Sequence, residues 1–509
     1  MPENRFNLID EPWIPVVDVG RVSLKDIFSN PNLKALGGNP VQKIALTKLL
    51  LAIAQSANTP ENDQAQSELG ADGLAKACLA YLEKWRNRFY LYGEKPFLQM
   101  PVIVEQIQKS KSKDKSARSY GMGFYPDLAS ENNTILSQYQ IEKSLNDAEK
   151  AVFLVTLMNF ALGGKRIIKN VPALTESYSG KSNSAKSGPS LGNYVGYLHS
   201  YLIGVSLQET IWLNLVSHDE ILKHKNWTSG LGIAPWELMP KGENDKPAQE
   251  LKSAYMGTLV ALSRFVFLED NGIYYLEGIQ YPSHKEGWFE LSVTQNSTTN
   301  PPKMLWLDTE KKPWRELTTL LAFFDSRANT GFSCRQLQYG FNRISRREEA
   351  IGIWSGGLKV RGTSGDQSVK QDDDFVESFV VLPPPNQITG SDSIWFENLQ
   401  SEMSELDLLA KTLYGCVMSY YKHQLVEGKN QAAQATNLFW QLCESRFQAL
   451  VNGADDEQQR LALRKVFAGF VHQAFELYCP KETARQLDSW AQSRPNLSKY
   501  LAQTNKEVA

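Results

Sequence analysis

Helical periodicity is clearest in the last quarter of the chain. Four segments, near residues 394–424, 432–452, 456–478 and 482–502, place apolar residues at every third or fourth position, and short polar turns separate them. Apolar residues at this spacing lie on one face of a helix, and helices with short connections pack beside one another in antiparallel order. The pattern predicts an antiparallel four-helix bundle.

The first part of the chain mixes strand and helix patterns. Residues 1–100 have the pattern of short strands followed by helices, and Asn39 and Pro40 suit the N-cap and first turn of a helix that continues to about Ala57. Its apolar face carries Ile44, Leu46, Leu49, Leu50 and Ile53. Further helices are predicted at 147–162 and 312–325, with strand-like runs between 193 and 330.

A long hairpin is predicted between Ile351 and Leu382. The run IGIWSGGLKV alternates as a strand does and leads into RGTSGDQ, after which SVKQDDDFVESFVVL returns as a strand. Glycine and aspartate at 362, 365 and 366 suit a tight turn, so we expect Gln367 at or beside the tip.

Three consecutive prolines, Pro383 to Pro385, and the polar stretch to Ser393 form the best candidate for a domain boundary. A chain of 509 residues also exceeds the roughly 250–300 residues at which single cores stop growing. We therefore predict an α+β protein with a large mixed α/β N-terminal domain, residues 1–393, followed by a C-terminal four-helix bundle, residues 394–509.

Composition narrows the class of protein. The chain is 42% hydrophobic and 22% charged, as globular proteins are. It begins with the charged, proline-containing segment MPENRFNLIDEPWIPV, and no segment reaches 18 uncharged apolar residues. We expect a soluble, cytoplasmic protein with no membrane partner. Its five cysteines lie far apart without a CxxC pair, so we expect reduced core residues rather than disulfides or a zinc site.

Net charge alone does not indicate nucleic-acid binding, because its value is −2. Three local segments are basic, however: 109–118, 165–186 and 335–371, the last of which includes Lys359 and Arg361. Each segment can follow a phosphate backbone, and each is equally compatible with a separate solvated patch.

Two motifs of catalytic proteins occur only in part. Gly188-Pro189-Ser190-Leu191-Gly192 fits GxSxG, but a nucleophile elbow needs a preceding strand, and a Ser/Gly/Lys loop precedes it here. Gly180-Lys181-Ser182 resembles the end of a phosphate-binding loop, but Thr175 occupies the position of its first glycine. We expect neither a hydrolase nor a nucleoside triphosphatase.

Metal chemistry is not indicated either. The six histidines show no ligand spacing, and adjacent carboxylates at Asp372, Asp373 and Asp374 would point to opposite faces of a strand. We expect no catalytic residues, no metal and no cofactor.

Two long polar segments, 101–140 and 163–192, are rich in glycine, serine, lysine and amide side chains. Long loops inside a domain tend to be functional or disordered. Asparagine and glutamine can read minor-groove base edges, and glycines let the backbone approach phosphates. These loops favour nucleic-acid binding, although ordinary loop composition explains the same residues equally well.

Three motifs go beyond this chemistry: Asn7-Leu8-Ile9-Asp10-Glu11-Pro12-Trp13-Ile14-Pro15-Val16, Pro96-Phe97-Leu98-Gln99 and Leu128-Ala129-Ser130-Glu131-Asn132-Asn133-Thr134. With the hairpin from Ser355-Gly356-Gly357 to Ser378 and the terminal bundle, they resemble the CasA family, the large subunits of the type I-E CRISPR surveillance complex Cascade. The resemblance covers nearly the whole chain.

The resemblance implies a subunit without catalytic activity of its own. Such a subunit reads the protospacer-adjacent motif in double-stranded DNA, largely from the minor groove, and a glutamine-bearing hairpin opens the first base pairs. Its implied partners are the guide RNA, the other Cascade subunits, target double-stranded DNA and a helicase-nuclease. The terminal bundle is expected to contact the small subunits.

Carried over to this sequence, the family's site residues fall in three loops. The wedge falls on Gly365, Asp366 and Gln367, and we expect the nearby Lys359 and Arg361 to contact DNA as well. The glycine loop falls on Gly180, Lys181, Ser182, Asn183 and Ser184. The loop that touches the 5′ end of the guide RNA falls on Asn132, Asn133, Thr134, Leu136 and Gln138.

Two departures from the family pattern affect the DNA-reading residues. The family's glycine run is replaced here by Gly180-Lys181-Ser182-Asn183-Ser184. The family also has a basic residue, its basic finger, at a position that falls here on Glu269, Asp270 and Asn271. Asn271, Arg264 or a residue elsewhere must then replace the finger. Two other readings stay open: a scaffold subunit that binds protein and RNA without reading DNA, and an enzyme that uses the acidic strand or Ser190.

Overall fold

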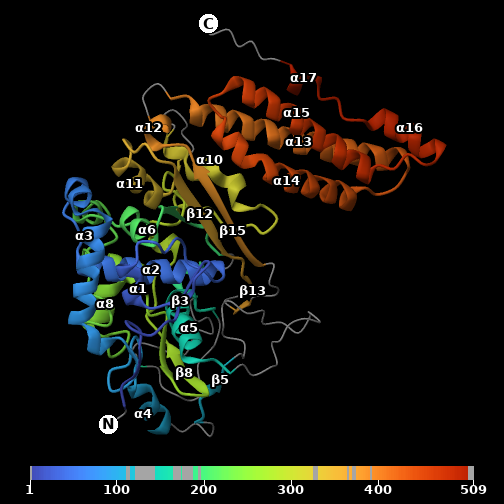
Figure 1. The fold of residues 1–509 in the computed structure, drawn as a ribbon. Coiled ribbons are helices and arrows are strands. Elements are labelled where there is room, and N and C mark those ends of the chain that lie inside the picture. Colours follow the sequence, from blue (N-terminus) through green and yellow to red (C-terminus); the bar gives the residue numbers. More distant parts are fainter. Residues whose placement is uncertain are drawn as a thin grey trace. The chain divides into compact units, whose positions relative to one another are not determined.

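The computed structural model describes residues 3–109, 115–120, 144–163, 174, 187–192, 196–324, 331–363, 366–368, 374–389 and 393–502, with the backbone alone at 361–363 and 366–368 (Figure 1). These residues form two compact units. The first falls within residues 1–314, 329–343 and 352–379, and the second within 315–328, 344–351 and 380–509.

The first unit contains most of the helical elements that precede the terminal bundle. They are α1 (Leu24–Ser29), α2 (Pro40–Ala57), α3 (Asp63–Lys84), α4 (Val102–Lys109), α5 (Asp147–Phe160), α6 (Leu207–Leu213), α7 (His218–Leu222), α8 (Lys246–Lys252), α9 (Tyr255–Leu259) and α11 (Arg335–Arg343).

Its strands are short and form several small sheets. They are β1 (Arg5–Asn7), β2 (Ile14–Val16), β3 (Gly20–Val22), β4 (Tyr90–Tyr92), β5 (Arg118–Ser119), β6 (His199–Ile203), β7 (Arg264–Leu268), β8 (Gly272–Glu277), β9 (Gln295–Asn296), β10 (Lys303–Met304), β11 (Phe332–Ser333), β12 (Ile351–Leu358), β13 (Arg361–Thr363), β14 (Asp366–Ser368) and β15 (Phe375–Leu382). The first residue of β12 and the last three of β15 belong to the second unit. Three sheets have three strands, in the orders β5-β8-β7, β15-β12-β6 and β10-β9-β11, and β1-β4, β2-β3 and β13-β14 form pairs.

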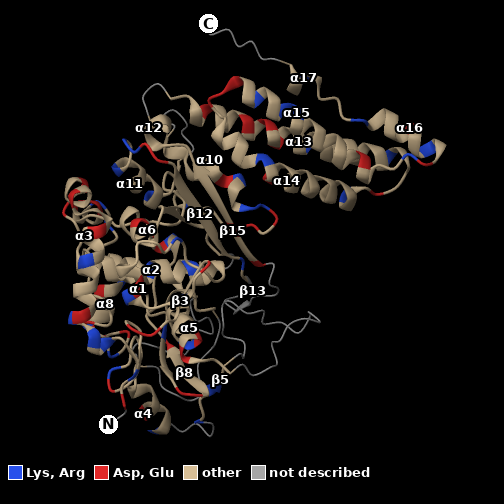
Figure 2. Ribbon diagram, in the orientation of Figure 1, with Lys and Arg blue, Asp and Glu red and all other residues tan. Residues whose placement is uncertain are grey.

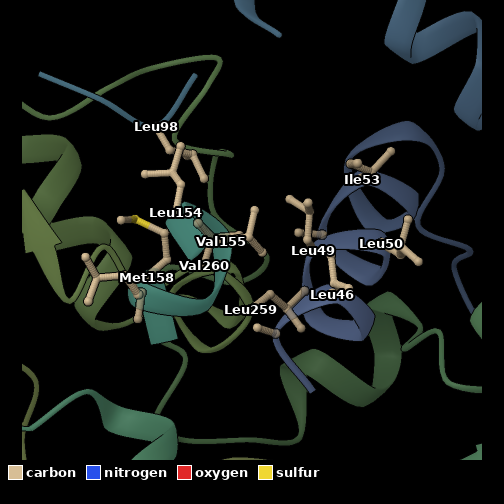
Figure 3. Close-up of a cluster of buried hydrophobic side chains, with 14 of the residues drawn as sticks. Leu46, Leu49, Leu50, Ile53, Leu98, Leu154, Val155, Met158, Leu259 and Val260 are labelled. Atoms are coloured by element: carbon tan, nitrogen blue, oxygen red, sulfur yellow. The ribbon is translucent and has the colours of Figure 1, made fainter. Parts of the chain in front are cut away.

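Helix α2 is the centre of the first unit's core. It begins as predicted, because the Asn39 side chain accepts from the Gln42 amide while Gln42 bonds back to the Asn39 amide. Leu46 and Leu49 of α2 point toward a group of apolar side chains from α5, α9 and their neighbours, and Leu50 and Ile53 belong to the same buried cluster (Figure 3). Each labelled side chain in this group is at most 3% exposed. Packing of this kind is the dominant stabilising contribution in a domain of this size.

The second unit is mainly helical. Its helices are α10 (Leu317–Leu320), α12 (Pro385–Ile388), α13 (Trp395–His423), α14 (Lys429–Asn452), α15 (Glu457–Tyr478), α16 (Ala484–Ser493) and α17 (Ser498–Leu501). Helix α13 packs against α14, α15 and α16. The α+β class and the C-terminal helical region are confirmed, while the boundary at residues 393 and 394 stays a prediction.

Two predicted helices are interrupted. The predicted helix 482–502 is divided into α16 and α17, because Pro495 lies between them and cannot donate the hydrogen bond that a continuous helix requires. The predicted helix 312–325 consists of two 3-10 turns, Pro313–Glu316 and Ala322–Phe324, on either side of α10. Tertiary packing overrides the helical pattern there, with the Arg315 guanidinium 3.7 Å from the centre of the Trp440 ring.

Lys and Arg positions are scattered among Asp and Glu positions on the described ribbon, most of which carries neither (Figure 2). Among the described residues, no helix combines the length and the apolar composition needed to cross a membrane.

Candidate nucleic-acid interface

The predicted wedge hairpin ends in a short antiparallel ladder. β13 pairs with β14 in the register Arg361 to Ser368, Gly362 to Gln367 and Thr363 to Asp366. Residues 364 and 365, between the two strands in the sequence, lie outside the described residues. Gly365 of the predicted wedge is one of them. The backbone puts Asp366 in the last described pair and Gln367 in the pair behind it, which accords with the expected position beside the tip.

The root of this hairpin is packed too closely for ordinary side chains. Gly356 pairs with His199 across β12 and β6. A Cβ atom on Gly357 would lie 2.5 Å from the carbonyl oxygen of Tyr197, and one on Gly196 would lie 1.9 Å from that of Leu358. Gly196 also has a φ of +97°, which favours glycine. The absence of side chains at these glycines thus allows β12 to pack closely against the segment that leads into β6.

Lys359 lies where the hairpin leaves this sheet. Its amide donates to the carbonyl oxygen of Asp374 at 2.8 Å, which joins the two arms of the hairpin. Its ammonium group is 3.5 Å from the hydroxyl of Thr309 and 4.0 Å from the carboxylate of Asp308, and 30% of the side chain is exposed. A phosphate could replace Asp308 as its partner, since Asp308 is itself 55% exposed.

The segment that follows the predicted glycine loop is held by a buried polar network. The loop residues Gly180 to Ser184 lie outside the described residues, but Ser190 belongs to the 3-10 turn Pro189–Leu191. Lys48 of α2 donates to the Ser190 hydroxyl at 2.5 Å and to the carbonyl oxygen of Thr258 at 2.8 Å, and it forms an ion pair with Glu290. This network anchors the turn to the centre of the core.

His199 extends the network into β6. Its Nε2 is 2.8 Å from the carbonyl oxygen of Ser190, while its Nδ1 is 3.0 Å from the hydroxyl of Ser292 and 3.3 Å from Glu290. Although burial alone would raise the pKa of the Glu290 carboxyl, the charges and hydrogen bonds of Lys48 and His199 lower this pKa to about 2. Glu290 is therefore a carboxylate at neutral pH.

The network contains the residue types of a hydrolase active site, but a substrate has no access to them. The Ser190 hydroxyl contacts Lys48 and Glu290, whereas His199 contacts the Ser190 carbonyl oxygen instead. Ser190 is 1% exposed, so a substrate cannot reach its hydroxyl in this conformation. Lys48 and His199 were not among the residues that the sequence patterns singled out. A lysine inside the apolar face of α2, at helical spacing from Ile44 and Ala52, was the available signal.

The turn between β7 and β8 carries Asn271 and is acidic, as its sequence indicates. Asp270 forms an ion pair with Arg5 at 2.5 Å, and the guanidinium of Arg5 lies 4.0 Å from the centre of the Tyr92 ring. The hydrogen bond and the charge of Arg5 lower the pKa of Asp270. Tyr120 donates to the carbonyl oxygen of Glu269 at 2.8 Å. Arg5 therefore partly neutralises the turn that presents Asn271, which is exposed.

Arg264, the other candidate for the missing basic finger, is unsuitable. It is 3% exposed, pairs with Glu277 at 3.1 Å and donates to the carbonyl oxygen of Leu162 at 2.7 Å. A buried cation needs such partners, and its burial keeps Arg264 from contact with DNA.

Other predicted site residues are less fully described. Arg361, Asp366 and Gln367 are described in their backbone alone. The predicted RNA-binding residues Asn132, Asn133, Thr134, Leu136 and Gln138 lie outside the described residues.

The basic segment 335–371 is partly neutralised. Arg343 pairs with Asp63 and Glu220, and Arg347 pairs with Glu349. Within the described ranges, no three His, Cys, Asp or Glu side chains gather as metal ligands would. All five cysteines are free, and all except Cys416 are buried. Their predicted place in the core is thereby confirmed for four of the five.

Residues 7–477 match the family described as CRISPR-associated protein Cse1. A protein of Thermus thermophilus called CRISPR-associated protein CasA/Cse1 is 27% identical over 342 residues, which cover 62% of this chain and 60% of that protein. The match thus spans less than two thirds of its length.

Solved structures show the same fold over 98% of the chain. The CasA protein of Thermus thermophilus has a TM-score of 0.71 at 19% identity and is covered to 99%. Thermobifida fusca Cse1 has a TM-score of 0.73 at 18% identity and is covered to 97%. A chain from a structure titled "CRISPR RNA-guided surveillance complex" has a TM-score of 0.65 at 14% identity and is covered to 100%.

Proposed function

The chain belongs to the CRISPR-associated protein Cse1 family, and we propose that it is the large subunit of an RNA-guided surveillance complex. The similarity of its fold to a chain of a CRISPR RNA-guided surveillance complex supports this role. Its partners are then a guide RNA and the other subunits of that complex, with the C-terminal bundle contacting the small subunits.

Within the complex, the chain recognises the protospacer-adjacent motif in double-stranded DNA and starts duplex opening. The observation that carries this proposal is the β13–β14 register, which puts Gln367 one pair behind the end of the described ladder. The exposed turn residue Asn271 and the partly exposed Lys359 supply polar and cationic contacts to the duplex. The loop Gly180 to Ser184 reads the motif, and residues 132 to 138 contact the guide RNA. The opened complex then recruits a helicase-nuclease.

Duplex binding tests motif recognition directly. A complex assembled with one guide RNA is offered target duplexes that differ only in the base pairs flanking the guide-complementary sequence. The affinity should fall by about tenfold or more when the flanking motif is changed, since each mismatched base pair costs about 1–3 kcal/mol in specific recognition. Equal binding to every flank would identify the chain as a scaffold that does not read DNA.

The chain itself is proposed to have no catalytic activity, because the Ser190 hydroxyl is inaccessible and no metal-ligand group occurs among the described residues. The purified chain should therefore neither cleave DNA nor hydrolyse ATP or esters. Metal-dependent nicking that disappears in an Asp373→Ala variant would overturn this part of the proposal.

A further inference from the structure

The Pro96-Phe97-Leu98-Gln99 motif forms one wall of a surface groove in the first unit. The groove has a cavity volume of about 340 Å³. Its apolar lining includes Pro96, Leu98, Met100, Trp236, Met239 and Pro240. None of the groove residues is a candidate for DNA or RNA contact, so duplex reading and opening leave this groove without a role.

The floor of the groove is rigid. The ring of Trp236 lies 5.7 Å from that of Phe97 and 5.6 Å from that of Phe89, and its indole nitrogen donates to the Tyr81 hydroxyl at 2.7 Å. Gln99 holds the adjoining wall, because its amide nitrogen donates to the carbonyl oxygen of Leu91 and its amide oxygen accepts from the Leu268 amide. A preformed apolar surface of this kind binds a ligand at little cost in ordering.

The rim of the groove is cationic. Arg88, Lys95 and Lys241 line it, and the only carboxylate among the lining residues is Glu94. Lys95 and Lys241 are exposed, and Arg88 is half-buried. Among the described residues, none forms an ion pair or a hydrogen bond with the side-chain cations of these three residues, although the backbone amide of Lys241 donates to the Asp245 carboxylate at 3.0 Å. The rim therefore keeps a positive charge that a ligand can neutralise.

We propose that this groove binds an extended segment of a partner protein in which apolar side chains alternate with carboxylates. The accessible apolar lining, which is the exposed Pro101 and Val102 and the half-buried Met239, accepts the hydrocarbon side chains. The cations at the rim pair with the flanking acidic residues. The volume suits two or three side chains rather than a folded domain, since ligand pockets of about 300–1,000 Å³ hold small ligands.

A nucleic acid fits the groove less well. Trp236 is 3% exposed, which leaves too little of its ring for a base to stack on. Pro96, Pro101, Pro235 and Pro240 line the groove and have no amide hydrogen to donate to a phosphate.

The experiment is a selection of random peptides of about ten residues on the full-length chain, followed by affinity measurements on the recovered peptides. The test variant Lys95→Glu/Lys241→Glu reverses two rim charges. The control variant Lys76→Glu/Lys225→Glu makes the same change in net charge at two exposed lysines outside the groove. Thermal melting compares the folding of both variants with that of the original chain.

Recovered peptides should contain both aliphatic residues and carboxylates, bind the control variant as they bind the original chain, and bind the test variant about tenfold more weakly. Failure to recover peptides, recovery of peptides without carboxylates, or equal binding to both variants would overturn the proposal. Displacement of a bound peptide by a short single-stranded DNA would assign the groove to nucleic acid instead. None of these outcomes depends on whether the complex reads flanking bases, so the two proposals fail separately.

Discussion

Lys48 and Ser190 are 142 positions apart in the chain, yet the ammonium group of Lys48 donates a hydrogen bond of 2.5 Å to the Ser190 hydroxyl. Lys48 also pairs with Glu290, and both side chains are at most 4% exposed. The turn after the predicted glycine loop is therefore joined to the central helix by charged groups rather than by apolar packing alone.

Lys48→Met should lower the free energy of unfolding by about 3–5 kcal/mol, because it leaves the Glu290 carboxylate buried without its cation. Urea unfolding of the purified chain measures this loss. Lys43→Met is the control on the same helix. Lys43 pairs with Glu377 where the two side chains are 22% and 37% exposed, and its loss should cost only about 0–1 kcal/mol. Equal losses in the two variants would contradict the importance of the buried network.

Gly196→Ala should destabilise the root of the hairpin. The new Cβ would lie 1.9 Å from the Leu358 carbonyl oxygen, and alanine is also strained at a φ of +97°. Gly20→Ala separates the two effects, since Gly20 has a φ of +99° but nothing within 4 Å of its Cβ position. We expect about 1–2 kcal/mol of destabilisation in Gly20→Ala from strain and a clearly larger value in Gly196→Ala. Similar decreases in melting temperature in the two variants would show that β12 moves away from residue 196 without a cost in stability.

Gln367→Ala should slow strand separation on an intact duplex but matter much less on a target already mismatched beside the motif. Opening each base-pair step of the duplex costs about 1.4 kcal/mol of stacking, and pairing with the guide RNA returns only about the same free energy. One amide that replaces a lost stacking contact can therefore decide whether strand separation starts. Association rates of the assembled complex with the two targets measure the difference. Ser368→Ala, one position farther from the turn, is the control. A Gln367→Ala rate equal to that of the original chain on the intact duplex would remove the wedge role.

Residues 394–509 should fold on their own, because α13 packs against three other helices of the same segment. Within this fragment, Glu402→Ala should lower the free energy of unfolding by about 3 kcal/mol. The Glu402 carboxylate is 4% exposed and accepts hydrogen bonds of 2.7–3.0 Å from Arg464, which would lose its partner. Circular dichroism during urea unfolding tests both statements, with Glu427→Ala as an exposed control. A fragment without helical signal would refute independent folding.

Stability should fall as the pH decreases from 6.5 to about 4, in part because of His224. Burial and the nearby charges of Arg335 and Lys223 lower the pKa of this imidazole to about 4. The unfolded chain therefore takes up the proton near pH 6.5, before the folded chain does, and protons stabilise the unfolded state over this interval. After allowance for partial exposure, His224 contributes about 1–2 kcal/mol of this loss. Urea midpoints should decrease less steeply with falling pH in His224→Phe, and an unchanged slope would assign the effect to other groups.

Local sequence patterns predicted the elements that local physics determines. Asn39, Pro40 and Gln42 form the start of α2 because a cap and a fixed proline φ act within one helical turn. The same holds for the hairpin, whose turn-forming residues and flanking strand pattern lie within one short segment. Helix breaks were harder to predict. Pro495 was visible in the sequence, but the apolar pattern on both sides concealed the interruption between α16 and α17.

Contacts between distant residues were not predictable from these patterns. Nothing near Arg264 in the sequence indicates that the carbonyl oxygen of Leu162 would accept its hydrogen bond, so it remained a candidate for DNA contact until its burial was known. The pairing of Arg5 with Asp270 likewise joins residues 265 positions apart. Positions of charged side chains along the chain show which groups exist, whereas only the fold shows which of them are already neutralised.

The two-residue connection between β13 and β14 has a consequence for how the hairpin can evolve. In the described ladder, Thr363 faces Asp366 and Gly362 faces Gln367. Inserting or deleting a single residue shifts that ladder, and a shift of one position sends each following side chain to the opposite face. Under the proposed wedge role, a change in hairpin length therefore alters every side chain that faces the duplex, whereas a substitution alters one, so the length of the hairpin is constrained together with Gln367.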